Sequence, residues 1–350
     1  MDRVRIGVVG CGNISQQNIR GYVQHPGAEV VALCDTRRER AEARASEFGI
    51  SPRITTDFAE LIADVEVDAV ELLTPTFLHA EQIVAALDAG KHVSCQKPIA
   101  VSLEEVDAIE AAVDRAGVTF RVTENFYTYP PILKAAELLE AGAIGEASLV
   151  RIHTTRAAGI TDPSITRYDD AAAWRREPER NLGGVMFDDA CHKYATAMLW
   201  AGDVAEVSAM VTATDDFVHE TPAVATLRFE RGALGIIDYA HQPGLTIRGK
   251  YTAVDELFEI HGPLGTIWVT QGQAETNDLA PVLLRTSDGL EEFDVASDYA
   301  VSFDGAAADF VDGLLEGRQP RQDLETARHV LEVAHAVYES ARSGQVVRLG

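Results

Sequence analysis

The chain has 350 residues, which exceeds one typical domain and fits two. Its formal net charge of −25 at pH 7 disfavours nucleic-acid binding, because neutralising phosphates requires clustered lysine and arginine. The hydrophobic content of 46% allows sizeable cores. No apolar run approaches about 18 residues and the first strand begins almost at Met1, so we expect no membrane span, no signal peptide and a cytoplasmic protein.

The first 125 residues alternate short apolar runs with helical patterns. A capping box, Ser102-x-x-Glu105, opens one of the helices, and Gly90 ends another. We predict strands before Gly10 and at residues 30–34, 69–73, 92–95 and 118–122, with helices at 39–49, at 79–89 and after Ser102. Such alternation is typical of a doubly wound parallel sheet with helices on both faces. Residues 1–125 are therefore predicted to form a Rossmann-type dinucleotide-binding domain.

The first turn of this domain carries a nucleotide-binding pattern. Gly10 permits a tight turn, Gly12 lets the backbone approach a pyrophosphate, and Ser15 is small enough for close packing of the helix on the strand. Asp35 ends the second apolar run, 23 residues after Gly12, close to the roughly 20 residues expected of a dinucleotide site. An ordinary strand–turn–helix is the alternative. The preceding strand, the spacing and the acidic residue, however, all indicate a dinucleotide site.

The acid also predicts which dinucleotide is preferred. The Asp35 carboxylate is placed to accept a hydrogen bond from a ribose 2′-hydroxyl and repels a 2′-phosphate, so we expect NAD. Arg37 and Arg38 follow closely and are able to receive such a phosphate. Use of NADP therefore stays open as an alternative.

After residue 125 the pattern changes to longer runs, several of which alternate apolar and polar residues. We predict a helix at residues 130–141, strands at 147–155, 205–214, 223–229, 233–239 and 257–261, a long loop at 159–181, and closing helices at 303–315 and 323–343. Residues 126–350 are therefore predicted to be an α+β domain with a large, open, mainly antiparallel sheet.

An open sheet has a second face to cover. Val224, Leu227, Ile236 and Ile267 supply apolar side chains along its strands, and some of these must point to the uncovered side. Because large apolar patches are rare on monomers, we predict a homo-oligomer, a dimer or a tetramer, formed through the sheet of residues 126–350.

Two loops follow predicted strands of the first domain, Thr74 to His79 and Gln96-Lys97-Pro98. Loops at the carboxyl ends of parallel strands face the ligand crevice. Pro98 restricts the backbone of Lys97 to extended conformations, which fixes the direction of the ammonium group. The alternative is a solvated surface lysine. The chain has only five lysines, however, and this one lies beside the predicted cofactor site: Lys91, Lys97, Lys134, Lys193 and Lys250.

Asp188 and His192 form a third feature. They are four residues apart and so share one face of a predicted helix. A carboxylate one turn away can orient an imidazole and stabilise its protonated form, which suits proton transfer near neutral pH. The alternatives are a surface ion pair and half of a metal site. We find no convincing further metal ligands and predict no metal, and the cysteines show no metal-like or disulfide spacing.

Taken in order, these motifs resemble the glucose–fructose oxidoreductase / inositol dehydrogenase (Gfo/Idh/MocA) family. The resemblance runs essentially from end to end and rests on Gly10-Cys11-Gly12-Asn13-Ile14, Thr74-Pro75-Thr76 with His79, Lys97-Pro98, Trp174-Arg175, Gly183-Gly184, Asp188-x-Ala190-x-His192, Gly262-x-x-Gly265-Thr266 and the closing residues 340–349. Each motif alone is modest, whereas the ordered set is specific.

The resemblance implies an NAD(P)-dependent oxidoreductase acting on a hydroxyl of a sugar, polyol or cyclitol. It implies His192 as the general acid or base, Lys97 as a hydrogen-bond partner of the same oxygen, and Asp188 as the residue that positions substrate and imidazole. It further implies that the cofactor is bound by Gly10, Gly12, Asn13, Ile14, Asp35, Arg37, Thr74, Thr76, His79, Gln96 and Lys97.

The sequence departs from the family pattern at three points. Gln96 stands where glutamate is usual, which removes a charge that favours protonated Lys97. Leu182 replaces the first residue of a triple glycine, and Ala190 replaces a glycine between the acid and the histidine. None removes a reacting group, but they leave the substrate open. We expect specificity from polar and aromatic side chains on one strand and in the long loop: Arg151, His153, Arg156, Tyr168, Trp174 and Arg175.

Two other functions are considered. One is a cofactor-binding sensor without turnover, and the presence of both Lys97 and His192 argues against it because a sensor needs no proton relay. The other is reduction of a C=C or C=N bond, as in biliverdin reductase-like relatives. The Asp188/His192 pair favours alcohol chemistry over that reaction.

Overall fold

The structure is a computed structural model that describes residues 2–177, 180–212 and 220–350. The chain forms two compact units. The first comprises Met1–Asn125 with Thr166–Leu182 and Phe303–Leu331, and the second comprises Phe126–Ile165, Gly183–Ser302 and Glu332–Gly350. Two segments of the first unit thus come from beyond residue 125. Within the described residues, no helix is both long and apolar enough to cross a membrane.

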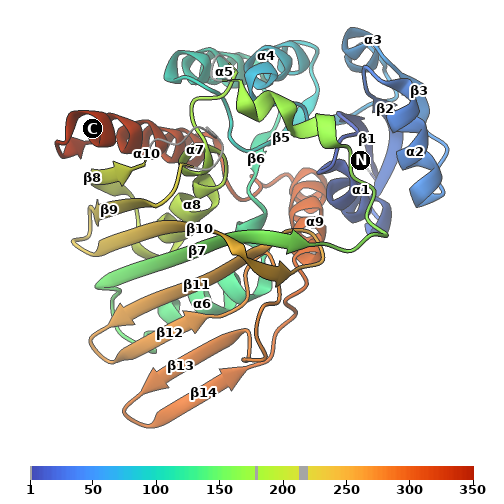
Figure 1. Ribbon diagram of the computed structural model, residues 1–350. Helices are drawn as coiled ribbons and strands as arrows, with labels where there is room; N and C mark the ends of the chain where they lie inside the picture. Colours follow the sequence, from blue (N-terminus) through green and yellow to red (C-terminus); the bar gives the residue numbers. More distant parts are fainter. Residues whose placement is uncertain (1, 178–179, 213–219) are drawn as a thin grey trace. The chain divides into compact units, whose positions relative to one another are not determined.

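The first unit is built on a six-stranded sheet in the order β3-β2-β1-β4-β5-β6 (Figure 1). All of its strand pairs are parallel: β1 Val4–Val9, β2 Ala28–Cys34, β3 Arg53–Thr55, β4 Ala69–Leu72, β5 His92–Gln96 and β6 Phe120–Thr123. The predicted doubly wound parallel sheet is confirmed. The strand order reverses between β1 and β4, and in such sheets ligands bind at the carboxyl ends of the strands beside this reversal.

Four helices of this unit agree closely with the predicted ones: α1 Ser15–Gln24, α2 Arg38–Phe48, α4 His79–Asp88 and α5 Leu103–Ala116. The short α3, Phe58–Ile62, was not predicted. Gly90 follows α4 with a φ of +75°, as expected for a residue that ends a helix. The predicted capping box is half formed. Ser102 Oγ accepts from the Glu105 amide at 3.2 Å, but the Glu105 carboxylate accepts from Val101, not from Ser102.

A helix from much later in the chain completes the core of the first unit. Helix α9, Ala300–Glu316, contributes Ala307, Phe310 and Val311 to the apolar cluster that surrounds β1 and α1. A Cβ atom on Gly21 of α1 would lie only 2.7 Å from the Cβ of Ala307, so glycine permits this contact. The core of the dinucleotide-type sheet therefore depends on residues about 300 positions away from β1.

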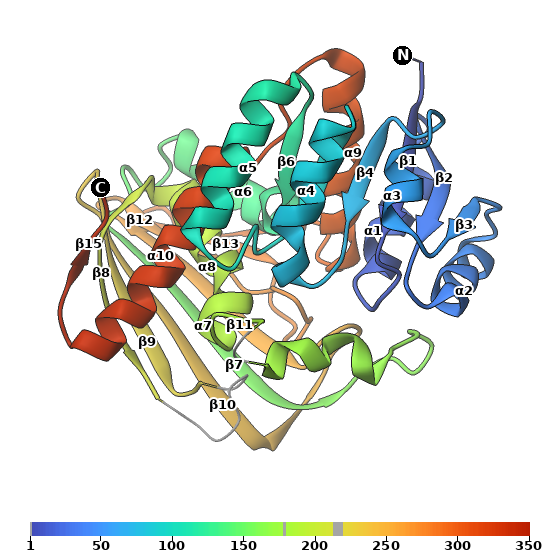
Figure 2. The same ribbon diagram turned by 90° about the horizontal axis from the view of Figure 1, so that it is seen from above.

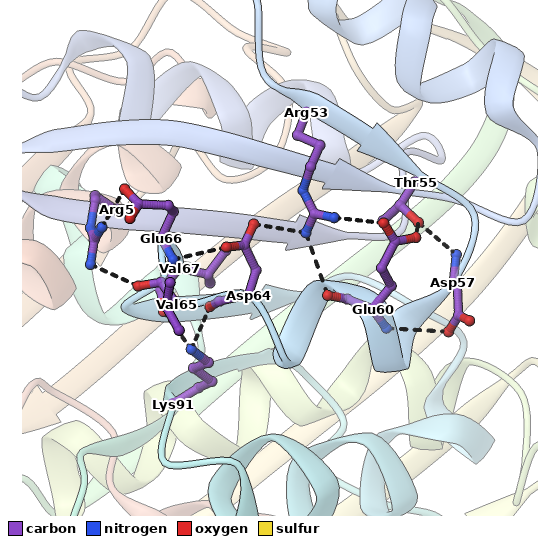
Figure 3. A network of polar contacts seen from close by, with 10 residues as sticks. All are labelled: Arg5, Arg53, Thr55, Asp57, Glu60, Asp64, Val65, Glu66, Val67 and Lys91. Atoms are coloured by element: carbon purple, nitrogen blue, oxygen red, sulfur yellow. Dashed lines mark hydrogen bonds and ion pairs between the residues drawn. The ribbon is translucent and has the colours of Figure 1, made fainter.

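Polar contacts secure the connection from β3 to β5 (Figure 3). Arg53 lies 2.8 Å from Glu60 and 2.9 Å from Asp64, which ties β3 to α3 and to the turn after it. Lys91 donates to the carbonyl oxygens of Asp64 and Val67 at 2.7 and 2.8 Å. This lysine therefore has a structural role, away from the chemistry predicted for Lys97.

The second unit contains a nine-stranded sheet, most of whose strands lie side by side in Figure 1 and are seen from above in Figure 2. Its order is β14-β13-β12-β11-β7-β10-β9-β8-β15, and every pair is antiparallel except β7 with β10. The bounds are β7 Leu149–Ile160, β8 Val204–Val211, β9 Ala223–Phe229, β10 Leu234–Arg248, β11 Val254–Gly262, β12 Gly265–Val269, β13 Val282–Thr286, β14 Gly289–Phe293 and β15 Val347–Arg348. The predicted open, mainly antiparallel sheet is confirmed.

Several details differ from the sequence prediction. Strands β12 to β15 were not predicted, and β10 is twice as long as its apolar run suggested because its second half is exposed. Residues 213–214 of one expected strand lie outside the described residues. The expected loop at 159–181 starts with the end of β7 and contains a 3-10 helix, η3 Asp169–Arg176.

One face of the large sheet is covered by helices α6 Pro130–Glu140 and α8 Ala190–Ala201. Ile152 and Thr154 of β7 are fully buried on that face. Leu227 and Ile267, which were candidates for the uncovered side, are also buried. Helix α10, Leu324–Ser343, follows near the end of the chain.

The opposite face, here called the outer face, carries a row of paired residues across five strands. The register aligns Met210 with Val224, Val224 with Asp238, Asp238 with His153, and His153 with Leu257. Met210 is 82% exposed, and Val224 and Leu257 are also classed as exposed. Val224 thus points outward as expected, and this face presents large apolar side chains to solvent.

Candidate active site

The glycine turn after β1 is held against two neighbouring strands. The Gly10 amide donates to the Cys34 carbonyl of β2 at 2.8 Å. Gly10 has a φ of +94°, and a Cβ atom there would lie 2.7 Å from the Leu73 carbonyl oxygen beside β4. Both the conformation and the space require glycine at this position. The turn therefore lies at the reversal of strand order, where dinucleotides bind in such folds.

Asp35 at the end of β2 is directly connected to this turn. Its Oδ2 accepts from the Cys11 amide at 2.8 Å, and its Oδ1 accepts from the Arg37 amide at 2.8 Å. Helix α1 starts after Ile14, which has no polar side chain to cap the helix, and its first turn contains no acidic residue. The amides at this helix end and the carboxylate of Asp35 fit the pyrophosphate and the ribose of a dinucleotide, respectively.

Arg44 is an unpredicted part of this region. It is fully buried, donates to Ser15 Oγ and to the Gly12 carbonyl at 3.0 Å each, and pairs with Glu47. Ser15 in turn donates to the Gly12 carbonyl at 2.6 Å. The small side chain expected at residue 15 is therefore also a link between the glycine turn and α2.

The side chain of Asn13 binds the backbone of a distant segment of the same unit. Its Nδ2 donates to the Tyr168 carbonyl at 3.1 Å, and its Oδ1 accepts from the Tyr168 amide at 2.7 Å. Trp174 of η3 packs edge-on against Phe77, with ring centroids 6.2 Å apart, and Arg175 lies 4.6 Å above the Trp174 ring. Three of the expected substrate residues, Tyr168, Trp174 and Arg175, thus lie with the dinucleotide-type unit.

His79 connects the two loops that follow β4 and β5. Its Nδ1 lies 2.8 Å from the Pro98 carbonyl oxygen and its Nε2 lies 2.8 Å from the Thr74 carbonyl oxygen. Burial lowers the pKa of His79. The ring therefore holds the backbone beside Lys97 against the Thr74 loop, and the Lys97–Pro98 peptide bond is cis. Thr76 is buried in the first of these loops, and Gln96, the last residue of β5, is also buried and lies 3.5 Å from Asn18.

His192 lies in the second unit, on a helix that differs from the predicted one. Helix α7, Val185–Asp188, ends before Asp189, and α8 begins at Ala190. Asp188 and His192 thus lie on two successive helices, separated by Asp189, whose backbone keeps right-handed helical angles of φ −95° and ψ −39°. The break coincides with a bond from the His192 amide to the Asp189 carbonyl, one residue nearer than in an α-helix. The buried His192 ring stacks on Phe126, with centroids 4.9 Å apart.

A buried charged cluster lies next to His192 in sequence and was not predicted. Lys193 has no exposed surface and pairs with Glu256 of β11, whose side chain is also fully buried. Asp189 lies 3.9 Å from Lys193 and accepts from the Tyr239 hydroxyl at 2.8 Å. Gln273 donates to both carboxylates, at 3.2 Å to Asp189 and 3.3 Å to Glu256. This network attaches the start of α8 to the sheet, and the shortage of lysines was the only sequence signal for it.

A cavity of about 370 Å³ opens beside this cluster, lined by the last residue of β10, by the segments that follow β7, β10 and β12, and by residues 297–299. Gln273 lines it, as do Tyr251 and Tyr299, whose ring centroids lie 6.4 Å apart. Tyr299 also contacts Phe126, the ring beneath His192, at 6.0 Å. Lys250 and Asp298 form an ion pair of 2.6 Å on the wall. Aromatic faces with polar groups between them suit a hydroxylated ring.

The remaining expected substrate residues lie on different faces of the large sheet. Arg151 lies 3.6 Å from Glu259, its partner on β11, and shares the outer face with His153. Strand alternation puts Arg156 on the opposite face, together with Thr154. Among the described residues no group of three or more His, Cys, Asp or Glu side chains could hold a metal ion, and all four cysteines are buried and outside any disulfide.

Both halves of the chain match known protein families. Residues 4–124 match the family described as "Oxidoreductase family, NAD-binding Rossmann fold", and residues 132–268 match the "GFO/IDH/MocA C-terminal domain". An uncharacterized oxidoreductase of Bacillus subtilis, YrbE, is 30% identical over 80% of this chain and 76% of its own length.

Two further comparisons cover nearly the whole chain. The D-xylose 1-dehydrogenase (NADP(+)) 2 of Haloferax volcanii is 28% identical over 98% of this chain and 99% of its own. The crystal structure of an oxidoreductase from Agrobacterium radiobacter, in complex with NAD+, L-tartaric acid and magnesium, superposes with a TM-score of 0.82. It is 25% identical and covers 99% of this chain and 98% of its own.

Proposed function

We propose, from the premise that the chain belongs to the Gfo/Idh/MocA oxidoreductase family, that it transfers a hydride between a nicotinamide cofactor and a hydroxyl-bearing carbon of a sugar, polyol or cyclitol. The family expected from the sequence motifs is confirmed, and with it the class of oxidoreductase. The observation that carries the proposal is the glycine turn joined to Asp35 at the reversal of strand order. When bound, the nicotinamide accepts the hydride or returns it.

We assign the cofactor to residues 1–125, and the substrate and assembly functions to residues 126–350. The turn at Gly10 and Gly12 and the uncapped start of α1 would bind the pyrophosphate, and Asp35 the adenosine ribose. Two of the other expected cofactor residues, Asn13 and His79, would contribute indirectly, because their side chains hold together the loops at the proposed cofactor site. We propose that NAD is preferred over NADP, since Asp35 carries a negative charge beside the ribose position.

The proton of the reacting hydroxyl must leave before or while the hydride does. We assign this proton to His192, whose imidazole is held by stacking on Phe126, and assign to Lys97 a hydrogen bond to the same oxygen. Asp188 has the role of positioning the substrate and the imidazole. A positioned acid–base group contributes roughly 10²- to 10⁴-fold to the rate.

For the substrate we propose the cavity lined by Tyr251, Tyr299 and Gln273. It is supported by the chain of ring contacts from Tyr299 through Phe126 to His192. Arg156 lies on the helix-covered face and stays a candidate, whereas Arg151 pairs with Glu259 on the outer face and is left out. Tyr168, Trp174 and Arg175 contact the dinucleotide-type unit, and we assign them to the cofactor side.

We further propose that the chain acts in the cytoplasm as a homo-oligomer, a dimer or a tetramer. Support comes from the exposed apolar side chains of the outer face, among them Met210, Val224 and Leu257. Pairing two copies of this face would bury them, and contiguous apolar patches on monomers are usually small.

A panel of sugars, polyols and cyclitols, followed by nicotinamide absorbance, tests the function. We expect turnover with a member of the panel, and the variants His192→Ala and Lys97→Ala should each lower kcat by at least about 10²-fold while cofactor binding persists. Lys134→Ala, which removes a lysine paired with Glu137 on α6, is the matched control and should keep full activity.

Other outcomes of this panel would replace the proposal. Nucleotide binding without turnover of any substrate would indicate a sensor. Turnover confined to reduction of conjugated C=C or C=N bonds would indicate a biliverdin reductase-like enzyme. Near-normal kcat in His192→Ala or Lys97→Ala would remove that residue from the proton-transfer role.

A further inference from the structure

Four arginines follow Asp35 closely, and each has an acidic partner within the first unit. Arg38 pairs with Glu42 at 3.0 Å and Arg44 pairs with Glu47. Arg37 and Arg40 both pair with a single carboxylate from far along the chain, that of Asp170, with the Arg40 contact at 2.5 Å. The Asp170 carboxylate therefore balances the charges of Arg37 and Arg40, which are not balanced by an acidic residue on α2.

Asp170 is held in this position by the segment that carries it. The residue lies in η3, and the preceding Tyr168 is fixed by two backbone bonds to the Asn13 side chain in the glycine turn. The Arg40 guanidinium lies 4.7 Å from the centre of the Tyr168 ring and is mostly buried, at 12% exposure of its side chain. The following Ala171 lies against Gly12, 3.6 Å from the place of a Cβ atom there. These contacts fix the carboxylate to the nucleotide turn.

The arginines concerned lie next to the residue that faces the ribose. Asp35 accepts from the Arg37 amide, so Arg37 belongs to the same turn as the proposed ribose-binding carboxylate. A guanidinium at this place is the group that accommodates a ribose 2′-phosphate in NADP-dependent enzymes. A guanidinium already paired with a carboxylate has to give up that pair before it can bind the phosphate.

We propose that Asp170 is a specificity-determining residue that excludes NADP by neutralising Arg37 and Arg40. This inference rests on the proposed dinucleotide site and names a residue 135 positions from Asp35 as the second element of cofactor choice. The charges support it. Arg37 and Arg40 carry two positive charges, and Asp35 and Asp170 cancel both, so no net attraction remains for a phosphate that carries about −1.5 to −2 charges at neutral pH.

The size of the effect follows from the exposure of the two pairs. The side chains of Arg37 and Asp170 are about half exposed, and Arg40, although mostly buried, pairs with the same half-exposed carboxylate. Partly exposed ion pairs of this kind contribute up to about 1 kcal/mol each, or roughly fivefold in affinity. Removing the charge of Asp170 releases two pairs. The dissociation constant of NADP+ should therefore fall by about 5- to 20-fold, while that of NAD+ changes by less than about twofold.

Calorimetric titration of the full-length protein with NAD+ and NADP+ tests the inference without an activity measurement. The variants are Asp170→Asn and the matched control Asp169→Asn, which removes the same charge one residue away. We expect tighter NADP+ binding in Asp170→Asn alone. In Arg37→Gln/Asp170→Asn part of that gain should be lost, because one of the two released arginines is gone while Arg40 remains.

Equal changes for both nucleotides, an equal effect in Asp169→Asn, or an unchanged NADP+ constant in Asp170→Asn would overturn the role of Asp170. Failure of the proposed function looks different, because the wild-type protein would then bind neither nucleotide. A wild-type preference for NADP+ would contradict the proposed NAD preference, while the shift in Asp170→Asn would still decide whether Asp170 opposes NADP+.

Discussion

Replacing Lys193 by methionine should strongly destabilise the second unit. Methionine has a similar length without the charge, so the change leaves the carboxylates of Glu256 and Asp189 buried without the ammonium group between them. Breaking a fully buried ion pair at one partner costs about 3–5 kcal/mol in free energy of unfolding. Both side chains here are fully buried, so solvent screening does not reduce the expected loss.

The double variant Lys193→Met/Glu256→Gln tests whether the loss of stability comes from the unpaired Glu256 carboxylate. The Glu256 carboxylate accepts from the backbone amide of Gln273 at 2.7 Å, and the side-chain carbonyl oxygen introduced by Glu256→Gln can still accept this bond. No uncompensated charge then remains in the Lys193–Glu256 pair. We therefore expect the double variant to lose much less stability than the two single variants added together. Such a difference measures the coupling of the pair directly.

The assay has to report on the second unit alone. Of the three tryptophans, Trp200 and Trp268 belong to that unit and Trp174 to the first. Urea unfolding followed by tryptophan fluorescence in a Trp174→Phe background therefore follows the second unit. A loss below about 1 kcal/mol for Lys193→Met, or single-variant losses that simply add up, would refute the argument for a coupled buried pair.

Two further predictions concern the outer face. Light scattering at micromolar concentration and moderate salt should give a particle mass that is a multiple of the chain mass of 37.9 kDa. The double variant Met210→Asp/Val224→Asp should lower the particle mass toward that of a single chain. A wild-type particle of single-chain mass would contradict the proposed assembly. The hydrogen bond that the His153 ring donates to the Asp238 carboxylate raises the pKa of His153 above its usual 6.5. This pair therefore stabilises the fold fully below about pH 6.5, and the contribution disappears as the pH rises through the folded-state pKa. Melting temperatures of wild type and Asp238→Asn across this range should converge at high pH, and parallel profiles would show that the pair has no such effect.

The dinucleotide half was predictable because its signals are local. The strands other than β3, which is Arg-Ile-Thr and was not predicted, come from short, mainly apolar runs. The glycine turn, Asp35 and the loops at Thr74 and Lys97 follow strands whose parallel order brings their ends to one edge. The order of motifs was enough to identify the family. The same local reasoning placed Asp188 and His192 on one helix and missed the one-residue break at Asp189. The side chain of Asp189 bonds Tyr239 of β10 and Gln273, which are both far away in the sequence.

Buried charges were the main features that the sequence did not reveal. Arg44 and Lys193 are residue types that usually lie on the surface, and only their partners from other elements, Ser15 and Glu256, explain why they are inside. Strands β12 to β14 were missed because they are short and, in β14, mostly exposed, so that apolar alternation is weak. The docking of η3 on the glycine turn depends on a side chain-to-backbone contact that no local pattern predicts.

The contribution of α9 to the first core has a consequence for biosynthesis. Residues 1–125 leave the ribosome first, yet Ala307, Phe310 and Val311, which close the apolar cluster around β1 and α1, are made about 180 residues later. At roughly 5–20 residues per second, that interval lasts about 10–40 s. During this time the nascent unit exposes the side of α1 around Gly21, against which α9 later packs, and chaperones can bind this surface. Expression of residues 1–125 alone would make this transient state permanent.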